Sequence, residues 1–318
     1  MVTRRSVGRA LGVILLGVVL LGGYLACYEP AYHGTLVPRP ARPLVFAHRG
    51  FGNLGPDNSL YAVEHALAAG MDGVDLDGQL TQDSEIVIFH DLSVDRLTSG
   101  TGRVRDKTTA EMLALDLGPK YNPTIHGASV HTFEDFVRTV MARGGGGGGG
   151  GGDGGGREGI LMTELKVPGL GATGIERRAV DIIRRNDAYE HVVLSSFNPF
   201  VLYRVKHLDP RVRTCFIFMD TNWNPQLLAE IKPEDRVDLP WIVRQEFIRR
   251  ALRKIIRPDL LSINHEVPAA VTDRLITKGW PVFIWTVNEE PDIRAALARH
   301  PYGVISDQPV RAKQLRDQ

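Results

Sequence analysis

The chain is poor in cysteine and has almost no net charge. It has two cysteines in 318 residues. Cys27 ends an apolar run and Cys215 lies in a predicted buried strand, so we expect no structural disulfide. The formal net charge is +1, which excludes the broad electrostatic attraction typical of nucleic-acid-binding domains. A hydrophobic content of 43% supports an ordinary core, and the length fits one domain of about 250 residues with a short appendage.

Charged side chains are absent from residues 10–28, which follow Arg4, Arg5 and Arg9. About 20 apolar residues are needed to cross a bilayer, whereas the apolar part of a cleaved signal has about 7–15. The pattern predicts a transmembrane anchor over 1–29 in a single-pass membrane protein. We expect the N-terminus to be cytoplasmic, because the arginines precede the run, and the folded domain to be extracytoplasmic. A twin-arginine export signal, a lipoprotein signal and a buried soluble helix are the alternatives.

Glycine is concentrated in one tract. Residues 144–156 contain twelve glycines and one aspartate, and no packing offsets the entropy of ordering such a segment, so it is predicted to be a mobile loop. The tract runs from a predicted helix into a predicted strand, whereas phosphate-binding glycine loops run from a strand into a helix. Four prolines between positions 29 and 43 predict an extended linker over 30–42. The folded domain then occupies 43–318.

Short apolar runs alternate with amphipathic stretches through the rest of the chain. Eight predicted strands with interleaved helices favour a closed parallel barrel, the (β/α)8 TIM-type fold, over an open sheet. One further strand is predicted at 86–89, followed by a long excursion over 92–129. The predicted strands are 44–47, 73–79, 160–165, 191–194, 212–218, 261–263, 282–286 and 303–305, and helices are predicted to begin near 58, 132, 174, 199, 239, 268, 290 and 309.

Residues 241–257 interleave apolar and basic side chains. This is the pattern of a basic amphipathic helix. We expect a barrel helix whose basic face lies in solvent, and contact with anionic lipid is the alternative.

The segment 46–91 holds two histidines and several carboxylates at the ends of, or inside, short apolar runs. Residues at the ends of barrel strands are presented to a ligand. His48 and His90 can exchange protons near neutral pH. Asp75 and Asp77 lie two residues apart in a predicted strand, so they project from one face and can share a hard cation.

Eight short motifs occur in order along the chain: HRG at 48–50, PDNS at 56–59, DLDGQLTQD at 75–83, HD at 90–91, TELK at 163–166, SSF at 195–197, WTVN at 285–288 and GVISDQP at 303–309. In this order they resemble the glycerophosphodiester phosphodiesterase family, and the resemblance extends over roughly residues 43–312. It implies a barrel with a small insertion near its mouth. It also implies an enzyme of lipid metabolism that hydrolyses phosphodiesters with the help of a divalent cation.

The resemblance also implies a role for each matching polar residue. Two histidines would act as acid and base, four carboxylates would bind the cation, and the remaining residues would hold phosphate and alcohol. Because only oxygen ligands are offered, Mg²⁺ or Ca²⁺ is favoured over zinc. The implied set is His48 and His90 as catalytic residues, Asp57, Asp75, Asp77 and Glu164 as metal ligands, and Arg49, Lys166 and Trp285 as substrate-binding residues.

Some of these residues have a purely structural interpretation. Asp57 could cap the helix that follows it, and Trp285 could fill the top of the barrel. Asp91 is interpreted as orienting a histidine or local backbone. The family pattern has glutamate where this chain has Asp57 and Asp75. The charge is kept but each side chain is one methylene shorter, so we expect altered metal preference or substrate geometry and retained activity.

Three functions are compatible with these motifs. The first is hydrolysis of glycerophosphodiesters such as glycerophosphocholine to an alcohol and glycerol 3-phosphate. The second is a lysophospholipase D that acts on membrane lysophospholipids, which the predicted anchor and basic helix favour. The third is a catalytically silent domain that binds head groups, which the complete set of catalytic residue types disfavours.

Overall fold

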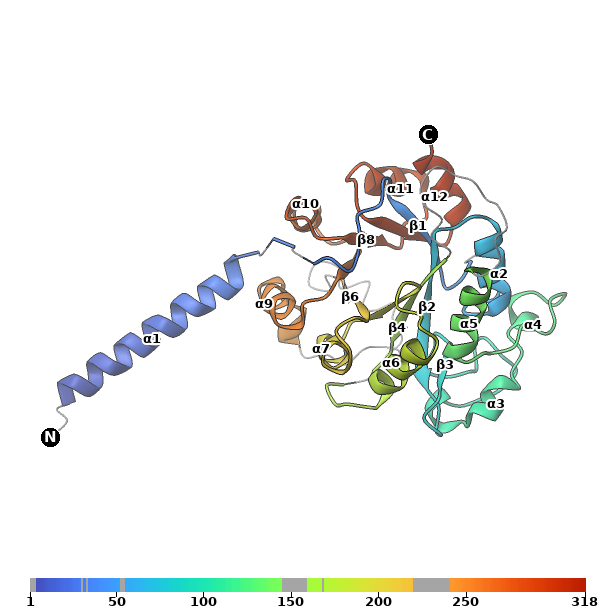
Figure 1. Cartoon of the computed structure of the whole chain (residues 1–318), viewed down its shortest axis with the longest axis horizontal. Coiled ribbons are helices and arrows are strands. Elements are labelled where there is room, and N and C mark those ends of the chain that lie inside the picture. The colour runs from blue at the N-terminus through green and yellow to red at the C-terminus, as the bar shows by residue number, and fades with distance from the viewer. Residues whose placement is uncertain are drawn as a thin grey trace.

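A closed barrel forms the centre of the molecule. The computed structural model describes residues 4–29, 31–32, 34–51, 55–144, 159–167, 169–219 and 241–318. Eight parallel strands follow the order β1-β9-β8-β7-β6-β5-β4-β2, and pairing of β1 with β2 closes the ring (Figure 1). The predicted TIM-type barrel is therefore confirmed. Its strands are β1 (Leu44–His48), β2 (Gly73–Leu80), β4 (Ile160–Leu165), β5 (Val192–Ser196), β6 (Arg213–Phe218), β7 (Leu260–Asn264), β8 (Val282–Trp285) and β9 (Gly303–Ser306).

Helices connect the strands and cover the outside of the barrel (Figure 1). Local sequence fixes where they begin: the Ser59 hydroxyl accepts the amide of Ala62 at the start of α2, and Asn198 precedes a proline at the start of α7. Beyond Gly144, the glycine tract 144–156, predicted to be a mobile loop, lies outside the described residues. The outer helices are α2 (Leu60–Ala68), α5 (Phe133–Gly144), α6 (Ile175–Arg185), α7 (Pro199–Leu208), α9 (Glu246–Ile256), α10 (Ala269–Thr277), α11 (Glu290–Leu297) and α12 (Pro309–Arg316).

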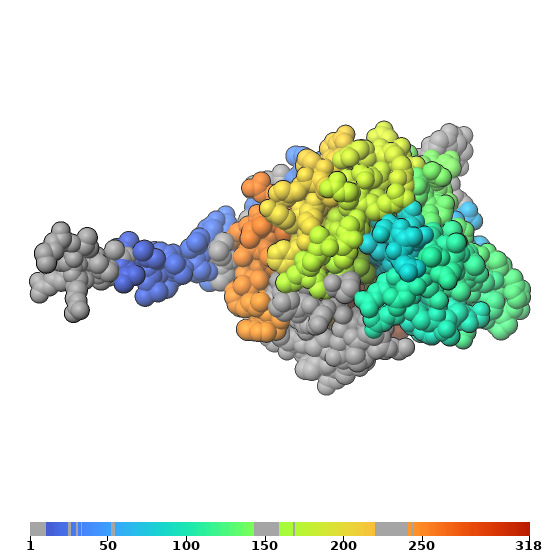
Figure 2. All heavy atoms as spheres, turned by 90° about the horizontal axis from the view of Figure 1, so that it is seen from below, coloured from blue at the N-terminus to red at the C-terminus, as the bar shows by residue number. Residues whose placement is uncertain are grey.

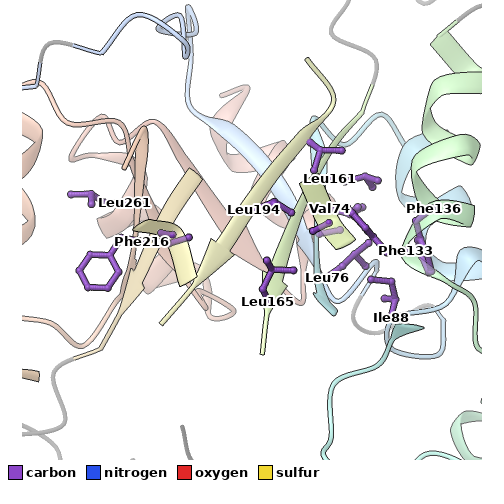
Figure 3. Close-up of a cluster of buried hydrophobic side chains, with 14 of the residues drawn as sticks. Val74, Leu76, Ile88, Phe133, Phe136, Leu161, Leu165, Leu194, Phe216 and Leu261 are labelled. Atoms are coloured by element: carbon purple, nitrogen blue, oxygen red, sulfur yellow. The ribbon is translucent and has the colours of Figure 1, made fainter. Parts of the chain in front are cut away.

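Strand side chains alternate between two apolar cores, because successive residues point to opposite faces. The outer core lies between strands and helices, and Figure 3 shows Val74 of β2 in the same cluster as Phe133 of α5. The inner core fills the barrel, where the rings of Phe46 and Phe283 lie 4.6 Å apart although their strands are not neighbours. Cys215 belongs to this inner core, and it is a free thiol, as predicted.

A small insertion follows β2. The predicted extra strand is confirmed as β3 (Ile86–Ile88), which pairs antiparallel with β2. The chain then forms η1 (Val104–Asp106), α3 (Thr109–Leu113) and α4 (Gly118–Tyr121) before it returns to α5. Its apolar residues form a separate small core under these short helices: Val87, Phe89, Val94, Val104, Met112, Leu117 and Val130. Because the insertion leaves from the carboxyl end of β2, it begins at the mouth of the barrel.

The N-terminal helix α1 (Arg4–Cys27) extends away from the barrel (Figure 1). Its apolar side chains from Leu11 to Leu21 are between 58% and 71% exposed. Among the described residues, however, none of the helices has both the length and the apolar character needed to cross a membrane. The predicted transmembrane helix is therefore not supported.

The residues after α1 were predicted to form an extended linker, and several of them lie against the barrel. The amide of Tyr32 donates to the carbonyl of Lys278 at 2.9 Å, and its ring lies 5.2 Å from that of Trp280. Val37 is buried in the inner core. Glu29 is 5% exposed. Contacts of this kind, between the residues after α1 and the barrel, cannot be predicted from amino-acid composition.

The basic segment 241–257 differs from its prediction. It is divided into η3 (Trp241–Arg244) and α9, and α9 lies next to the end of α1 (Figure 2). Two of its arginines, Arg249 and Arg253, are 2% and 1% exposed, so the expected solvated basic face is wrong for them. Their burial is compensated by the ring of Phe218, 4.9 and 5.8 Å from the two guanidinium carbons, and by the carboxylate of Glu29, 2.6 Å from Arg253.

Candidate active site

The polar side chains of the site form a layer directly above the inner core. Four of them lie two residues beyond an apolar residue of that core, and residues two apart in a strand share a face. The layer therefore lies at the carboxyl ends of the strands, which is the functional face of such barrels. The pairs of core and site residues are Phe46 and His48, Met162 and Glu164, Phe283 and Trp285, and Ile305 and Asp307.

Strand register brings the predicted carboxylates together. His48 is paired with Asp75 between β1 and β2, and Asp77 is paired with Glu164 between β2 and β4. The ammonium of Lys166 lies 3.0 Å from Asp77 Oδ1 and 3.2 Å from Glu164 Oε2. All of these groups are largely removed from solvent. Their charges therefore interact strongly, because water screens them little.

The carboxylates carry more negative charge than the neighbouring cations neutralise. Burial, opposed by His48 and aided by Asp77 and Glu164, raises the pKa of Asp75 to about 7. Burial also raises the pKa of Glu164, although Lys166 opposes it. Against the effect of burial, Lys166 and then His90 and Arg49 hold the pKa of Asp77 well below its ordinary value.

The same carboxylates have the chemistry of a hard-cation site. Within the described residues, no three histidine, cysteine or carboxylate side chains converge on a common point that would hold a metal ion as they stand. Instead, the Lys166 ammonium bridges Asp77 and Glu164. Yet the donors of Asp75, Asp77 and Glu164 are all oxygens, and two of the three have raised pKa values that a divalent cation would relieve. The residues therefore fit Mg²⁺ or Ca²⁺ chemically.

His90 lies at the end of the segment after β3 and is held from both ring nitrogens. Its Nδ1 is 2.7 Å from Asp91 Oδ1, and its Nε2 is 2.9 Å from Nη2 of Arg49. Asp91 in turn accepts two hydrogen bonds from Arg96, at 2.6 and 2.8 Å. Burial, and then the charge of Lys166, lowers the pKa of His90. The predicted interpretation of Asp91 agrees with this contact to a histidine.

Arg49 links both halves of the site. Its backbone has a φ of 52°, which turns the chain sharply after β1. Its Nη1 donates to Asp57 Oδ2 at 3.1 Å, while its Nη2 reaches His90. Asp57 does not cap the following helix, because Ser59 does so. Asp57 contacts the arginine rather than the bridged carboxylates, and its role as a fourth metal ligand stays a prediction.

His48 and Trp285 line the other side of the barrel mouth. Nδ1 of His48 lies 2.7 Å from Asp307 Oδ1. Trp285 meets the ring of Phe197 edge to face at 5.8 Å between centroids. The buried Nε1 of Trp285 has no hydrogen-bond partner among the described residues, so it can donate to a bound molecule.

Three further residues belong to the site but were not predicted from the sequence: Asn58, Asn288 and Asp307. Asn58 donates to Asp77 Oδ2 at 2.9 Å and accepts the amide of Asp77 at 3.0 Å, so it orients that carboxylate. Asn288 donates to Asp307 Oδ2 at 2.7 Å. All three lie inside motifs that can be recognised in the sequence. Asn288 and Asp307 also come just after predicted barrel strands, and this position could have identified them as candidate site residues.

A sequence profile described as the glycerophosphoryl diester phosphodiesterase family matches residues 48–145 and 163–311. These ranges contain every site residue described above. The probable glycerophosphodiester phosphodiesterase 1 of Mycobacterium tuberculosis is 41% identical over 263 residues, which cover 79% of this chain and 84% of that protein. A glycerophosphodiester phosphodiesterase of Caldanaerobacter subterraneus subsp. tengcongensis is 27% identical over 268 residues, covering 84% and 95%.

Solved structures share the fold. A putative glycerophosphoryl diester phosphodiesterase from Silicibacter pomeroyi has a TM-score of 0.68 at 20% identity, with coverage of 89% of this chain and 95% of that one. A phosphodiesterase from Oleispira antarctica, in complex with the product sn-glycerol-3-phosphate, has a TM-score of 0.66 at 21% identity, with coverage of 87% and 98%.

Proposed function

This chain belongs to the glycerophosphoryl diester phosphodiesterase family, and on that premise we propose a metal-assisted, two-histidine mechanism that releases an alcohol and glycerol 3-phosphate. The chain is a phosphoric diester hydrolase. One observation carries the proposed mechanism: His48 and His90 are each hydrogen-bonded to an aspartate, and among the described residues only the aspartate of His90 is also paired with an arginine. The two imidazoles therefore have different electrostatic environments.

His90 has the environment of a general base. A guanidinium can only donate, so the Nε2 that faces Arg49 carries a lone pair. Nδ1–H then donates to Asp91, whose charge is shared with Arg96. With its pKa lowered, mainly by burial, His90 is neutral at pH 7, and once the Arg49 guanidinium turns to the phosphate its Nε2 can accept the proton of the attacking oxygen.

His48 has the environment of a general acid. Among the described residues its partner Asp307 makes no ion pair with a lysine or arginine, and besides the imidazole it accepts a hydrogen bond only from the neutral amide of Asn288. A carboxylate that no guanidinium or ammonium neutralises stabilises an imidazolium. His48 can therefore donate a proton to the departing alkoxide, which completes the transfer that His90 begins.

The carboxylates and cations divide the remaining work. Asp75, Asp77 and Glu164 would hold Mg²⁺ or Ca²⁺, with Asp57 as a fourth carboxylate. When bound, such a cation draws charge from the phosphoryl oxygens. Arg49 and Lys166 supply the positive charge that holds the phosphate. Trp285 would lie against the glycerol or the alcohol.

Product analysis tests the reaction directly. Purified protein is incubated with glycerophosphocholine and each divalent cation in turn, and choline, phosphocholine and glycerol 3-phosphate are measured. We expect choline and glycerol 3-phosphate, and loss of both with Asp77→Asn. Release of phosphocholine and glycerol would show cleavage of the other ester bond and would contradict the proposal.

A lysophospholipase D activity is the second candidate, and apolar side chains near the mouth favour it. Phe197 extends the wall formed by Trp285. Leu170, after β4, and Phe200, at the start of α7, are 44% and 38% exposed. Both follow the carboxyl end of a barrel strand, β4 and β5 respectively, on the side where an acyl chain would leave the barrel. Leu170→Ser with Phe200→Ser should lower kcat/KM for lysophosphatidylcholine and leave that for glycerophosphocholine unchanged.

Attachment to a membrane through α1 is a separate proposal. The helix exposes apolar side chains to the surroundings. Tyr24, in its last turn, stacks on Tyr28 just beyond the helix, and the ammonium of Lys254 lies 4.4 Å from the ring of Tyr24. Aromatic and basic groups of this kind favour a lipid–water interface. Full-length protein should sediment with membranes and resist high salt, whereas a chain that begins at residue 29 should not. The side of the membrane on which the barrel lies stays a prediction from the N-terminal arginines.

A further inference from the structure

We propose that Asp307 and Asn288 are a positioning pair that fixes the ring of His48, so that its Nε2 alone exchanges a proton with the substrate. The inference rests on the proposed two-histidine mechanism. It gives Asn288, which the mechanism does not use, a role, and it adds the control of ring orientation to the charge that Asp307 supplies.

The contacts form a chain of three side chains. His48 Nδ1 lies 2.7 Å from Asp307 Oδ1, and Asn288 Nδ2 donates to Asp307 Oδ2 at 2.7 Å. Each carboxylate oxygen therefore has one donor. The carboxylate cannot rotate without breaking one of these bonds, so the ring of His48 is fixed through its Nδ1.

Backbone contacts fix the pair itself. Ala47 and Ser306 are register partners of β1 and β9, which places Asp307 beside His48. The amide of Asp307 donates to Asn288 Oδ1 at 2.9 Å, so the asparagine side chain is held at both ends. Asn288 thus connects the loops after β8 and β9, and each loop end faces the histidine at the end of β1.

The charge of Asp307 is also preserved. Against the effect of burial, hydrogen bonds from His48 and Asn288 lower the pKa of Asp307, so it is an anion at pH 7. An anionic acceptor requires that Nδ1 of His48 carry a proton. The other nitrogen, Nε2, is left as the one that faces the reaction. Asp91, the aspartate that contacts His90, is paired with Arg96, whereas among the described residues Asp307 has no arginine at ion-pair distance and is affected by Arg49 only from further away.

A purely structural role, in which the pair only joins two loops, predicts different results. It predicts lower stability with unchanged chemistry per folded molecule. A positioning role predicts lower kcat with unchanged KM and unchanged melting temperature. The matched control is Asp292→Asn, which removes an exposed carboxylate from the nearby helix α11.

We would measure glycerophosphocholine hydrolysis by the full chain with Mg²⁺ present. Asp307→Asn should lower kcat by about 10²-fold or more, within the roughly 10²–10⁴-fold that an acid–base group contributes. Asn288→Ala should lower it by about tenfold, since a neutral hydrogen bond is worth less than the charge it orients. Asp307→Glu should restore part of the rate, because it keeps the charge. The Asp292→Asn control should match the wild type.

Two results decide between the roles. In a His48→Ala background, Asp307→Asn should cause no further loss, because its effect passes through that ring. ¹⁵N NMR of histidine-labelled wild type should show His48 protonated at Nδ1, with His48→Ala used for assignment. Losses that multiply in the double variant, or a His48 that carries its proton on Nε2 alone, would overturn the inference. An inactive wild type with the predicted NMR pattern would overturn the proposed function and leave the hydrogen bond in place.

Discussion

Asp77 and Glu164 are register partners on adjacent parallel strands, and one ammonium group links them, 3.0 Å from the first and 3.2 Å from the second. The ammonium belongs to Lys166, which lies two residues after Glu164 and therefore on the same face of the chain. A divalent cation would bind the same carboxylate oxygens that this lysine contacts. We therefore expect them to compete in the substrate-free protein.

Lys166→Met tests this competition. The variant keeps an unbranched side chain but removes the charge that bridges two buried carboxylates. We expect tighter binding of Mg²⁺ or Ca²⁺, lower stability of the metal-free protein, and slower turnover because the phosphate loses a contact. Isothermal titration calorimetry measures the affinity, with Lys278→Met as an exposed control. Weaker cation binding by Lys166→Met would contradict competition.

Stability should depend on pH through Asp75. Its pKa is raised to about 7 from 3.8, so the folded protein holds a proton that the unfolded chain releases between these values. Without metal, stability therefore falls as pH rises from about 4 to 7, and the full penalty is present above 7. A divalent cation should raise the melting temperature more at pH 8 than at pH 5. In Asp75→Asn the cation should raise the melting temperature by similar amounts at the two pH values. An equal rise at both pH values in the wild type would refute the role of Asp75.

Loss of both histidines should lower kcat little more than loss of one. His48→Ala and His90→Ala should each lower kcat by about 10²–10⁴-fold without a change in melting temperature. The double variant should be little worse than the worse single, because each residue serves the other's proton transfer. His126→Ala, in the exposed part of the insertion, is the control. Effects that multiply would show two independent roles.

The N-terminal limit of the stable barrel should lie at Glu29. Its carboxylate is buried 2.6 Å from Arg253, whose side chain is itself fully buried. Breaking a buried ion pair by removing one partner costs about 3–5 kcal/mol. A chain that begins at residue 29 should melt like the full-length protein, and a chain that begins at residue 31 should melt at a lower temperature. Glu190→Gln, which removes an exposed partner of Arg213, should have little effect; equal melting of both shortened chains would disprove the role of Glu29.

The barrel could be predicted from sequence because its signals are local. Runs of apolar residues bounded by turns predict all eight strands to within two residues of their observed ends. The site residues were predictable for a similar reason, since period-two spacing puts Asp75 and Asp77 on one face and motif order joins them to Glu164. These relations need only the sequence and the pleat of a strand.

What could not be predicted depends on contacts between distant segments. The contact of Asp307 with His48 exists because β9 pairs with β1 across 259 residues of sequence. The burial of Arg253 depends on Glu29, the last residue of the segment 1–29 that was predicted to be a membrane anchor. Amphipathic pattern alone therefore predicted a solvated arginine. The contact of Asp57 with Arg49 could not be predicted either. A carboxylate before the first turn of a helix is compatible both with capping the helix and with binding an arginine.

The leaving-group dependence of the two histidine variants tests the central claim most directly. A glycerophosphodiester whose alcohol is 4-nitrophenol needs little protonation of its leaving group, because nitrophenolate is a stable anion near neutral pH. If His48 is the acid and His90 the base, His48→Ala should lose far less activity on this substrate than on glycerophosphocholine, and His90→Ala should lose the same on both. Equal losses for His48→Ala on the two substrates would contradict the assignment.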